Sequence, residues 1–229
     1  MINLTAIVPF YNEENTLKQS VERLLNEDIF SEIILSDDNS SDNSLEIAKT
    51  LSHEYQHIKY ISSDINLGKG NAINNAVSIL NTSHVVIHDA DLEYFPEDIV
   101  QMYEKAIANQ NSLILGSRFK GNKKRENVYL RTYFANRIMS TFFSLVNFYW
   151  VSDVATCYKL MPSNFLKNIS IKEQGFSIEI EVLSKFLKYN KHILEIPISY
   201  EGRSYDEGKK IKVTDGIMYI INTLKYRFI

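Results

Sequence analysis

The sequence of 229 residues is poor in cysteine, with Cys157 alone, and it has no long apolar run. A single cysteine excludes an internal disulfide bond and is typical of a reducing compartment. The first residues do not show the basic segment and apolar core of a signal peptide. The longest apolar-rich stretch, residues 142–151, is shorter than the ~20 residues that a membrane-spanning helix needs. These absences predict a cytoplasmic protein for which any contact with a membrane is peripheral.

The formal net charge is only −3, which gives no reason to expect nucleic acid or another polyanion as a partner. Hydrophobic residues make up 45% of the chain and charged residues 23%, as in soluble proteins with an ample core. No repeat, low-complexity linker or shift in composition divides the chain, so a single domain over residues 1–229 is expected. Charge is uneven only in the basic block, residues 117–137, where seven Lys or Arg accompany one acid, Glu126. The basic block predicts an anionic partner or surface.

Short apolar runs alternate with helical patterns along the first half of the chain. Between the runs, apolar residues recur at the three- and four-residue spacing of helices. Repeated strand–helix units over ~110 residues predict a mostly parallel sheet flanked by helices, with right-handed crossovers. The fold class is therefore α/β, of the nucleotide-binding kind. The predicted strands are residues 4–10, 32–36, 58–62, 84–88 and 112–117.

The second half predicts longer helices and fewer strands. Helical patterns cover residues 128–151, 176–189 and 211–228, and the first of these is rich in aromatic residues. Strands are expected at 153–161 and at 193–200. Pro197 indicates an edge or bulged strand, because proline cannot donate a hydrogen bond to a neighbouring strand.

Acidic residues follow the predicted strand 84–88 at alternate positions, as Asp89, Asp91 and Glu93. Carboxylates so close together repel one another unless a cation lies between them. A hard divalent ion such as Mg²⁺ or Mn²⁺, with phosphate oxygens as its other ligands, fits this pattern. The alternative is a solvated acidic turn before a helix that begins near Pro96.

Polar residues also follow three other predicted strands, at residues 11–14, 37–38 and 66–70. Because the carboxyl ends of parallel strands form the ligand crevice of a doubly wound sheet, these segments are expected to meet the acidic one. The pair Asp37 and Asp38 either hydrogen-bonds a nucleobase or ribose, or caps a turn.

The segment 66–70, NLGKG, lacks the spacing of a Walker loop or of a dinucleotide GxGxxG motif. Its glycines would let the backbone approach a ligand, and Lys69 could reach a phosphate. A plain loop leading into a helix is the alternative interpretation.

Five short motifs stand in register along the chain: VPFYNEE, SDDNSSDNS, NLGKGNA, IHDADLE and GSRF. Together they resemble the inverting family 2 glycosyltransferases of GT-A fold. Within that family the resemblance is to the polyprenyl-phosphate hexosyl synthases, whose type is dolichyl-phosphate mannose synthase. It covers essentially the whole chain, because the second half carries three further similar segments. These are VSDVATCYKLM, similar to the family's D-x-x-(S/T)-G-(F/Y)-(R/K) segment, and the branch-like motifs GFSIEIEVL and EIPISYEGRSYDEGKK.

The resemblance implies that residues 1–118 form the half that binds a nucleotide sugar. Asp89 and Asp91 would hold the donor diphosphate through Mg²⁺ or Mn²⁺, with Glu93 as a third metal ligand. Asp38, together with Asp37, would read the base. The implied donor-binding residues are Pro9, Tyr11, Glu13, Asp37, Asp38, Asn66, Gly68, Lys69, Asp89, Ala90 and Asp91.

The resemblance also implies that residues 119–229 form the acceptor side, with a helical and aromatic extension. Asp153 stands at the position of the family's catalytic carboxylate, and Asp91 is the second implied catalytic residue. Two positions depart from the branch's pattern: Cys157 replaces a glycine, and Ala135 stands where a serine is common. Donor or acceptor phosphates would be bound by Arg118, Arg131, Arg203, Lys209 and Lys210.

No membrane anchor follows Ile229 in this sequence, so contact with a lipid is expected to be peripheral. Eight apolar residues of the aromatic-rich helix could form an interfacial surface, and the alternative is that they pack on the sheet. They are Phe134, Ile138, Phe142, Phe143, Leu145, Phe148, Tyr149 and Trp150.

The implied function is metal-dependent, inverting transfer of a hexose from a UDP- or GDP-sugar to a polyprenyl phosphate at the cytosolic membrane face. A divalent ion and arginines would stabilise the charge that develops on the departing nucleoside diphosphate. A phosphate acceptor is already an anion and needs no base, whereas a hydroxyl acceptor would need a carboxylate such as Asp153.

Three alternatives remain from the sequence. The first is transfer to a sugar or peptide hydroxyl, with Asp153 as the base. The second is a nucleotidyltransferase, which would have a glycine-rich loop near the N-terminus, whereas residues 8–12 contain no glycine. The third is a nucleotide-sugar sensor without turnover, against which the intact pair Asp89 and Asp91 argues.

Overall fold

A seven-stranded sheet forms the centre of the computed structural model, which describes residues 2–127, 129–175, 177–202 and 213–228. The strands lie in the order β3-β2-β1-β4-β7-β5-β8, and all neighbouring pairs are parallel except those of β7. The mostly parallel α/β sheet predicted from the sequence is therefore present. The strands are β1 (Leu4–Phe10), β2 (Phe30–Asp37), β3 (Ile58–Ser62), β4 (His84–Ile87), β5 (Leu113–Ser117), β7 (Lys159–Pro162) and β8 (Ile193–Pro197).

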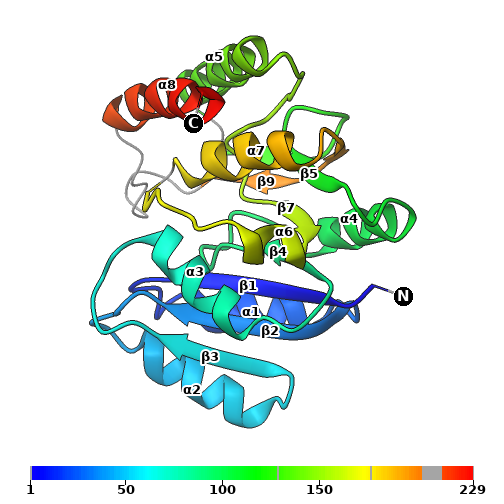
Figure 1. Ribbon diagram of the computed structural model, residues 1–229. Helices are drawn as coiled ribbons and strands as arrows, with labels where there is room; N and C mark the ends of the chain where they lie inside the picture. The colour runs from blue at the N-terminus through cyan, green and yellow to red at the C-terminus, as the bar shows by residue number, and fades with distance from the viewer. Residues whose placement is uncertain (1, 128, 176, 203–212, 229) are drawn as a thin grey trace.

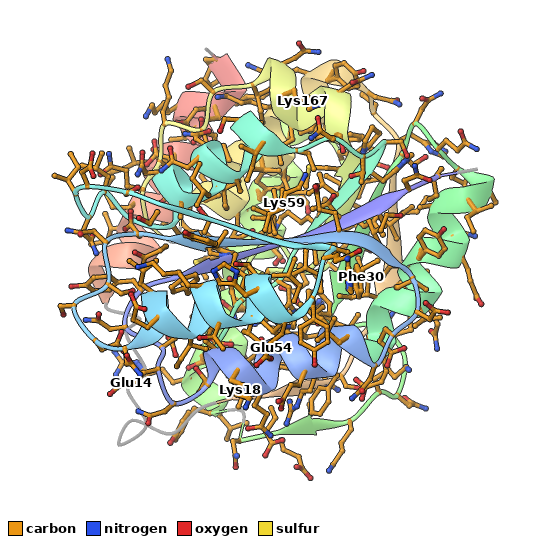
Figure 2. The ribbon with its side chains drawn as sticks, turned by 90° about the horizontal axis from the view of Figure 1, so that it is seen from below. Glu14, Lys18, Phe30, Glu54, Lys59 and Lys167 are labelled. Atoms are coloured by element: carbon orange, nitrogen blue, oxygen red, sulfur yellow. The ribbon has the colours of Figure 1, made fainter. Side chains whose placement is uncertain are left out.

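Three helices connect the first four strands: α1 (Leu17–Leu25), α2 (Ser44–Glu54) and α3 (Lys69–Ile79). Figure 2 shows α1 and α2 on one face of the sheet and α3 on the other. The chain changes direction across the sheet between the neighbouring strands β1 and β4. Ligands of open α/β sheets bind at such a switch point, outside the carboxyl ends of the strands. In Figure 2, Glu14, which follows β1, lies at the opposite edge from Phe30, where β2 begins.

Strand β7 inserts between β4 and β5 and is antiparallel to both. The strand expected at residues 153–161 is shorter than predicted. Residues 153–158 form a loop, and only residues 159–162 pair with neighbouring strands. Since β7 runs in the opposite direction, this preceding loop lies at the carboxyl edge of β4 and β5. The position of Asp153 follows from that reversal.

Helices α5 (Leu130–Asn147) and α8 (Val213–Phe228) lie together at one end of the molecule, beyond α7 (Ile178–Tyr189) (Figure 1). Helix α8 packs against both α5 and α7. Within the described residues, no helix combines the length and apolar character needed to cross a membrane. Of the eight apolar residues expected at an interface, five are exposed and Phe143 is fully buried. The exposed five are Phe134, Ile138, Leu145, Phe148 and Trp150.

The remaining elements are short or peripheral. Helix α4 (Glu97–Ala108) follows β4, and α6 (Ser163–Asn168) follows β7. Strands β6 (Arg125–Glu126) and β9 (Tyr200–Glu201) form a separate two-stranded pair. Strand β8 is an edge strand, as Pro197 predicted.

Candidate active site

The loops that follow β1 and β2 are joined by hydrogen bonds between their polar residues. Asn12, with a φ of 54°, accepts a 2.8 Å hydrogen bond from the Ser41 backbone N–H. The backbone N–H of Glu13 donates to Ser44 Oγ at 2.8 Å. Pro9 is buried in β1, and Tyr11 is exposed beside this junction. The serines of the SDDNSSDNS motif therefore fix the loop that carries Tyr11 and Glu13, a role that the sequence did not reveal.

Asp37 and Asp38 are both buried, and they act differently. Asp37 Oδ1 accepts a 3.0 Å hydrogen bond from the Ser40 backbone N–H, which is the turn-capping interpretation. Asp38 accepts from the backbone N–H groups of Leu67 and Gly68, at 3.2 and 2.5 Å. Asp38 thus anchors the 66–70 loop to the end of β2, and its contact with a nucleobase stays a prediction.

Gly68 makes a close approach to the loop that precedes α7. Its φ of +91° lies in the left-handed region, and a Cβ there would be 2.3 Å from the Gln174 carbonyl oxygen. Only glycine fits this position without displacing the backbone. Asn66, two residues earlier, is exposed.

The acidic segment after β4 places its three carboxylates in different surroundings. Asp89 Oδ1 lies 2.7 Å from Lys69 Nζ. Asp91 Oδ1 accepts a 3.1 Å hydrogen bond from the Glu93 backbone N–H, and Ala90 between them is buried. Glu93 Oε2 accepts a 2.7 Å hydrogen bond from the Tyr200 hydroxyl. The metal role of these residues stays a prediction, because no group of three His, Cys, Asp or Glu is arranged as a metal site in the described part of the chain.

Lys69 lies between two carboxylates. Its Nζ is 2.7 Å from Asp89 and 3.1 Å from Glu179 Oε1 at the start of α7. Burial disfavours the charge of Lys69, but the two carboxylates outweigh burial and hold the pKa of Lys69 well above its ordinary value. Burial likewise opposes ionisation of Asp89, but the Lys69 ammonium prevails and lowers the pKa of Asp89. Both groups are therefore charged at neutral pH.

The second oxygen of Glu179 binds another lysine. Glu179 Oε2 pairs with Lys159 Nζ, which also donates to the Thr156 carbonyl oxygen. Lys159 is fully buried, and Glu179 is nearly so. The four side chains Asp89, Lys69, Glu179 and Lys159 therefore form a line of alternating charge, which we call the charge line. Glu179 and Lys159 were not predicted as site residues, although charged residues within the apolar segments YKLM and SIEIEV were an available signal.

Arg118 and Asp153 form a separate buried ion pair, and it is bidentate. Arg118 Nε and Nη2 donate to the two carboxylate oxygens of Asp153, each at 2.8 Å, and the Arg118 backbone N–H donates at 3.0 Å. Asp153 is fully buried, and the Arg118 guanidinium lies 4.9 Å from the ring centre of Tyr200. Both oxygens of the predicted catalytic carboxylate thus accept hydrogen bonds within the protein.

A buried histidine precedes the acidic segment. His88 Nε2 lies 3.0 Å from Ser20 Oγ, and its Nδ1 lies 2.9 Å from the Tyr158 hydroxyl. Burial lowers the pKa of His88 to about 4, so its ring is neutral at pH 7. His88 therefore supports the end of β4 without adding positive charge beside Asp89.

Most of the basic block is neutralised within the protein. Lys120 pairs with Glu195 at 3.0 Å, Lys123 with Asp98 at 3.0 Å and Lys124 with Glu126 at 2.9 Å. With the Arg118–Asp153 pair added, four of the seven basic residues have a carboxylate partner within the protein, and the anionic partner expected for this block stays a prediction. A count of charges along the sequence overstated the free positive charge, because most of the neutralising carboxylates come from distant parts of the sequence. Arg131 is exposed on α5, and Arg203, Lys209 and Lys210 lie outside the described residues.

A family model described as glycosyl transferase family 2 matches residues 5–170, which is more than half of the chain. The chain belongs to glycosyl transferase family 2. The family predicted from the motifs, and with it the enzyme class, is confirmed.

Among curated proteins, this family 2 glycosyltransferase is 28% identical over 212 residues to a dolichol-phosphate mannosyltransferase of Pyrococcus furiosus, covering 91% of this chain. The chain spans only 59% of that relative's length. It is 29% identical over 240 residues to a Methanococcus voltae protein named UDP-N-acetylglucosamine–dolichyl-phosphate N-acetylglucosaminyltransferase. That match covers 96% of this chain and 94% of the relative.

Among solved structures, glucosyl-3-phosphoglycerate synthase from Mycobacterium tuberculosis in complex with UDP has a TM-score of 0.75 and 15% identity. The match covers 100% of this chain and 81% of that chain. A complex of the same synthase with Mn²⁺, UDP and glucosyl-3-phosphoglycerate has a TM-score of 0.74 and 16% identity. This likeness establishes the fold and confirms the predicted GT-A type of sheet for the family 2 chain.

Proposed function

We propose that this glycosyltransferase moves a hexose from a UDP- or GDP-sugar to a polyprenyl phosphate, with inversion at the anomeric carbon. Curated relatives named for dolichyl-phosphate acceptors support this acceptor class. One of these relatives is named for a UDP-sugar donor. A screen of donors would identify the base and the hexose that this chain uses.

The observation that carries the proposal is the state of Asp153. Its carboxylate is fully buried, and both of its oxygens accept hydrogen bonds from Arg118. A hydroxyl acceptor needs a base within hydrogen-bond reach, and the fully buried Asp153 could serve only if the surrounding structure opened to admit the acceptor. A phosphate acceptor is already ionised and needs no base. The Asp153–Arg118 pair then has the role of fixing a guanidinium near the departing diphosphate.

The residues after β4 fit a divalent cation. The pair Asp89 and Asp91 supplies carboxylate oxygens at the carboxyl edge of the sheet, and Asp89 already binds a cation, the Lys69 ammonium, at 2.7 Å. Mg²⁺ and Mn²⁺ take one or two protein carboxylates together with substrate phosphates, so a third protein ligand is not required. Asp89 and Asp91 would hold this ion, which when bound would neutralise charge on the donor diphosphate. The solved structural neighbour that contains Mn²⁺ and UDP supports this assignment.

The chain's own side chains would do the rest. Lys69 would contact the diphosphate, and Arg118 would stabilise the charge that develops on it as the anomeric bond breaks. On the acceptor side, the exposed Arg131 would bind the lipid phosphate.

We propose that one exposed apolar surface, formed by α5 and α8, contacts the membrane from its cytosolic side and so reaches the lipid acceptor. We call it the apolar face. Arg131 lies on α5 beside these residues, so the lipid phosphate and its apolar chain would meet the same end of the molecule (Figure 1). The apolar face consists of Leu130, Phe134, Ile138 and Leu145 on α5, Phe148 and Trp150 directly after α5, and Ile217, Met218, Ile220, Ile221, Leu224 and Phe228 on α8.

A donor and acceptor screen tests the proposal. The protein with Mn²⁺ is given UDP- and GDP-sugars, with and without a short-chain polyprenyl phosphate, and release of nucleoside diphosphate is recorded. Release that requires the lipid phosphate and is lost in Asp91→Ala supports the proposal and names the sugar. Slow donor hydrolysis that ignores the lipid would reject the phosphate acceptor and favour a hydroxyl. Absence of any donor turnover would reject the donor class.

A further inference from the structure

Glu179 contacts the predicted donor site without belonging to any of its predicted ligand sets. It lies at the start of α7, and each of its two oxygens binds a different lysine, Lys69 or Lys159. Lys69 and Glu179 are 110 residues apart in the sequence. Burying the charges of Glu179 and Lys159 is costly unless each has a partner, and Lys69 and Asp89 continue the line toward the partly exposed site.

The metal ion of the proposed function would change the balance of the charge line. In the described structure Lys69 is held by Asp89 and by Glu179. A divalent cation on Asp89 would repel the ammonium that now lies 2.7 Å from that carboxylate. Glu179, on the other side of Lys69, would then be the described carboxylate that keeps the ammonium in place.

Lys159 makes Glu179 suited to this task. Its ammonium is fully buried and is fixed by the Thr156 carbonyl oxygen, so it orients one oxygen of Glu179 and leaves the other for Lys69. It also balances the negative charge of Glu179. Glu179 and Lys159 therefore form a rigid support behind the long, flexible side chain of Lys69.

We propose that Glu179 is a positioning residue that holds the Lys69 ammonium at the donor diphosphate once Asp89 has bound the divalent ion. The proposal rests on the proposed function, because it assumes a nucleoside diphosphate bound through a metal ion. Glu179 itself contacts neither the metal nor the substrate. Its effect is transmitted through Lys69 alone.

The test measures binding of UDP and of GDP by titration calorimetry in the presence of Mn²⁺, for wild type, Glu179→Gln, Lys69→Met and the double variant. We expect Glu179→Gln to weaken binding about tenfold, the loss of one hydrogen bond to a charged group. In the Lys69→Met background the same substitution should change binding less than about twofold, because the two residues act as a unit. Donor KM should rise in parallel, and acceptor KM should not.

Glu32→Gln is the matched control. Glu32 is also a buried carboxylate that pairs with a lysine, Lys59, but at the amino edge of the sheet (Lys59 is labelled in Figure 2). It should lower the melting temperature and leave nucleotide binding unchanged. A merely structural role for Glu179 would give the same result as Glu32.

Each outcome decides between the two claims. If wild type binds UDP or GDP and Glu179→Gln binds it with the same affinity, the role of Glu179 is overturned and the donor class stands. An equal loss in both Lys69 backgrounds would also overturn it. Wild type that binds neither nucleotide would overturn both claims. If Glu179→Gln does not fold, Glu179→Asp replaces it, since the shorter side chain keeps the charge but cannot span both lysines, and the same coupling to Lys69 is expected.

Discussion

Asp153 receives three hydrogen bonds from one residue, Arg118: two from the guanidinium and one from the backbone N–H. This bidentate pair is buried, so neither charge is compensated by water. The arrangement joins the end of β5 to the loop that precedes β7. It holds one arginine of the site in a single orientation.

Asp153→Asn should therefore affect stability as well as activity. Removing one charge of a buried pair leaves the other uncompensated, and we expect a loss of about 3 kcal/mol in the free energy of unfolding. Urea denaturation followed by circular dichroism measures it. Glu126→Gln, which opens the exposed pair with Lys124, is the control and should change stability by less than about 0.5 kcal/mol. Full stability with abolished turnover would instead indicate a base.

Asp91→Asn should abolish binding of nucleoside diphosphate that depends on Mn²⁺. The substitution keeps the size of the side chain and removes the negative charge that a hard cation requires. Calorimetry with UDP and GDP, with Mn²⁺ and with EDTA, separates the metal-dependent part. Equal Mn²⁺-dependent binding in wild type and variant would show that Asp91 is not a ligand.

Gly68→Ala should destabilise the protein by more than about 1 kcal/mol and weaken donor binding. The left-handed φ of +91° and the Gln174 carbonyl oxygen both oppose a Cβ at this position. Gly216→Ala is the control, because nothing lies within 4 Å of its Cβ and alanine favours the helix α8. Thermal unfolding should therefore move in opposite directions for the two variants, and a shared direction would contradict this account.

Acid should weaken the fold partly through His84. Burial lowers the pKa of His84 below its ordinary value of 6.5, against the opposing hydrogen bond from its Nε2 to the Gln110 carbonyl oxygen. The folded protein thus binds fewer protons than the unfolded chain below pH 6.5, and stability falls as pH falls through that range. Urea unfolding of wild type and His84→Gln at pH values of about 7.5, 6.5 and 5.5 measures the difference in their free energies of unfolding. A constant difference between the two proteins at all pH values would exclude this contribution.

The apolar face should govern binding to vesicles. Replacing Phe134 and Ile138 by serine removes exposed apolar surface from α5, so co-sedimentation with phosphatidylcholine–phosphatidylglycerol vesicles should fall. The melting temperature should stay within about 2 °C, because surface substitutions rarely alter stability. Ile107→Ser on α4, another exposed isoleucine, is the control and should sediment like wild type. Equal sedimentation of all variants would argue against the apolar face.

The fold was largely predictable because periodicity is local. Strand and helix patterns located β1 to β5 within a few residues, and Pro197 identified β8 as an edge strand. The loop at residues 153–158 was not predictable, because most of its residues are buried, as those of a central strand would be. The insertion of β7 between β4 and β5 depends on pairing between distant segments, which no local pattern encodes.

The site was predictable only as a set of strand ends. The segments at Asp38, Lys69 and Asp89 do lie along one edge, because parallel strands bring their carboxyl ends together. The partners of these residues were not predictable. Glu179 reaches Lys69 from 110 residues away, and Glu195 of β8 neutralises Lys120 in the loop after β5. A charge count along the sequence cannot see such pairs.

The place of β7 also constrains how the chain can fold as it is synthesised. The four strands β3, β2, β1 and β4 are contiguous in both sequence and sheet, so they can pair as soon as residue 87 has left the ribosome. Strand β5 emerges next but has no neighbour, because its partners β7 and β8 are translated later. Until residues 159–162 have been synthesised, the edge of β4 that later pairs with β7 has unpaired backbone N–H and C=O groups. During this interval the nascent chain can pair with a wrong strand or bind a chaperone.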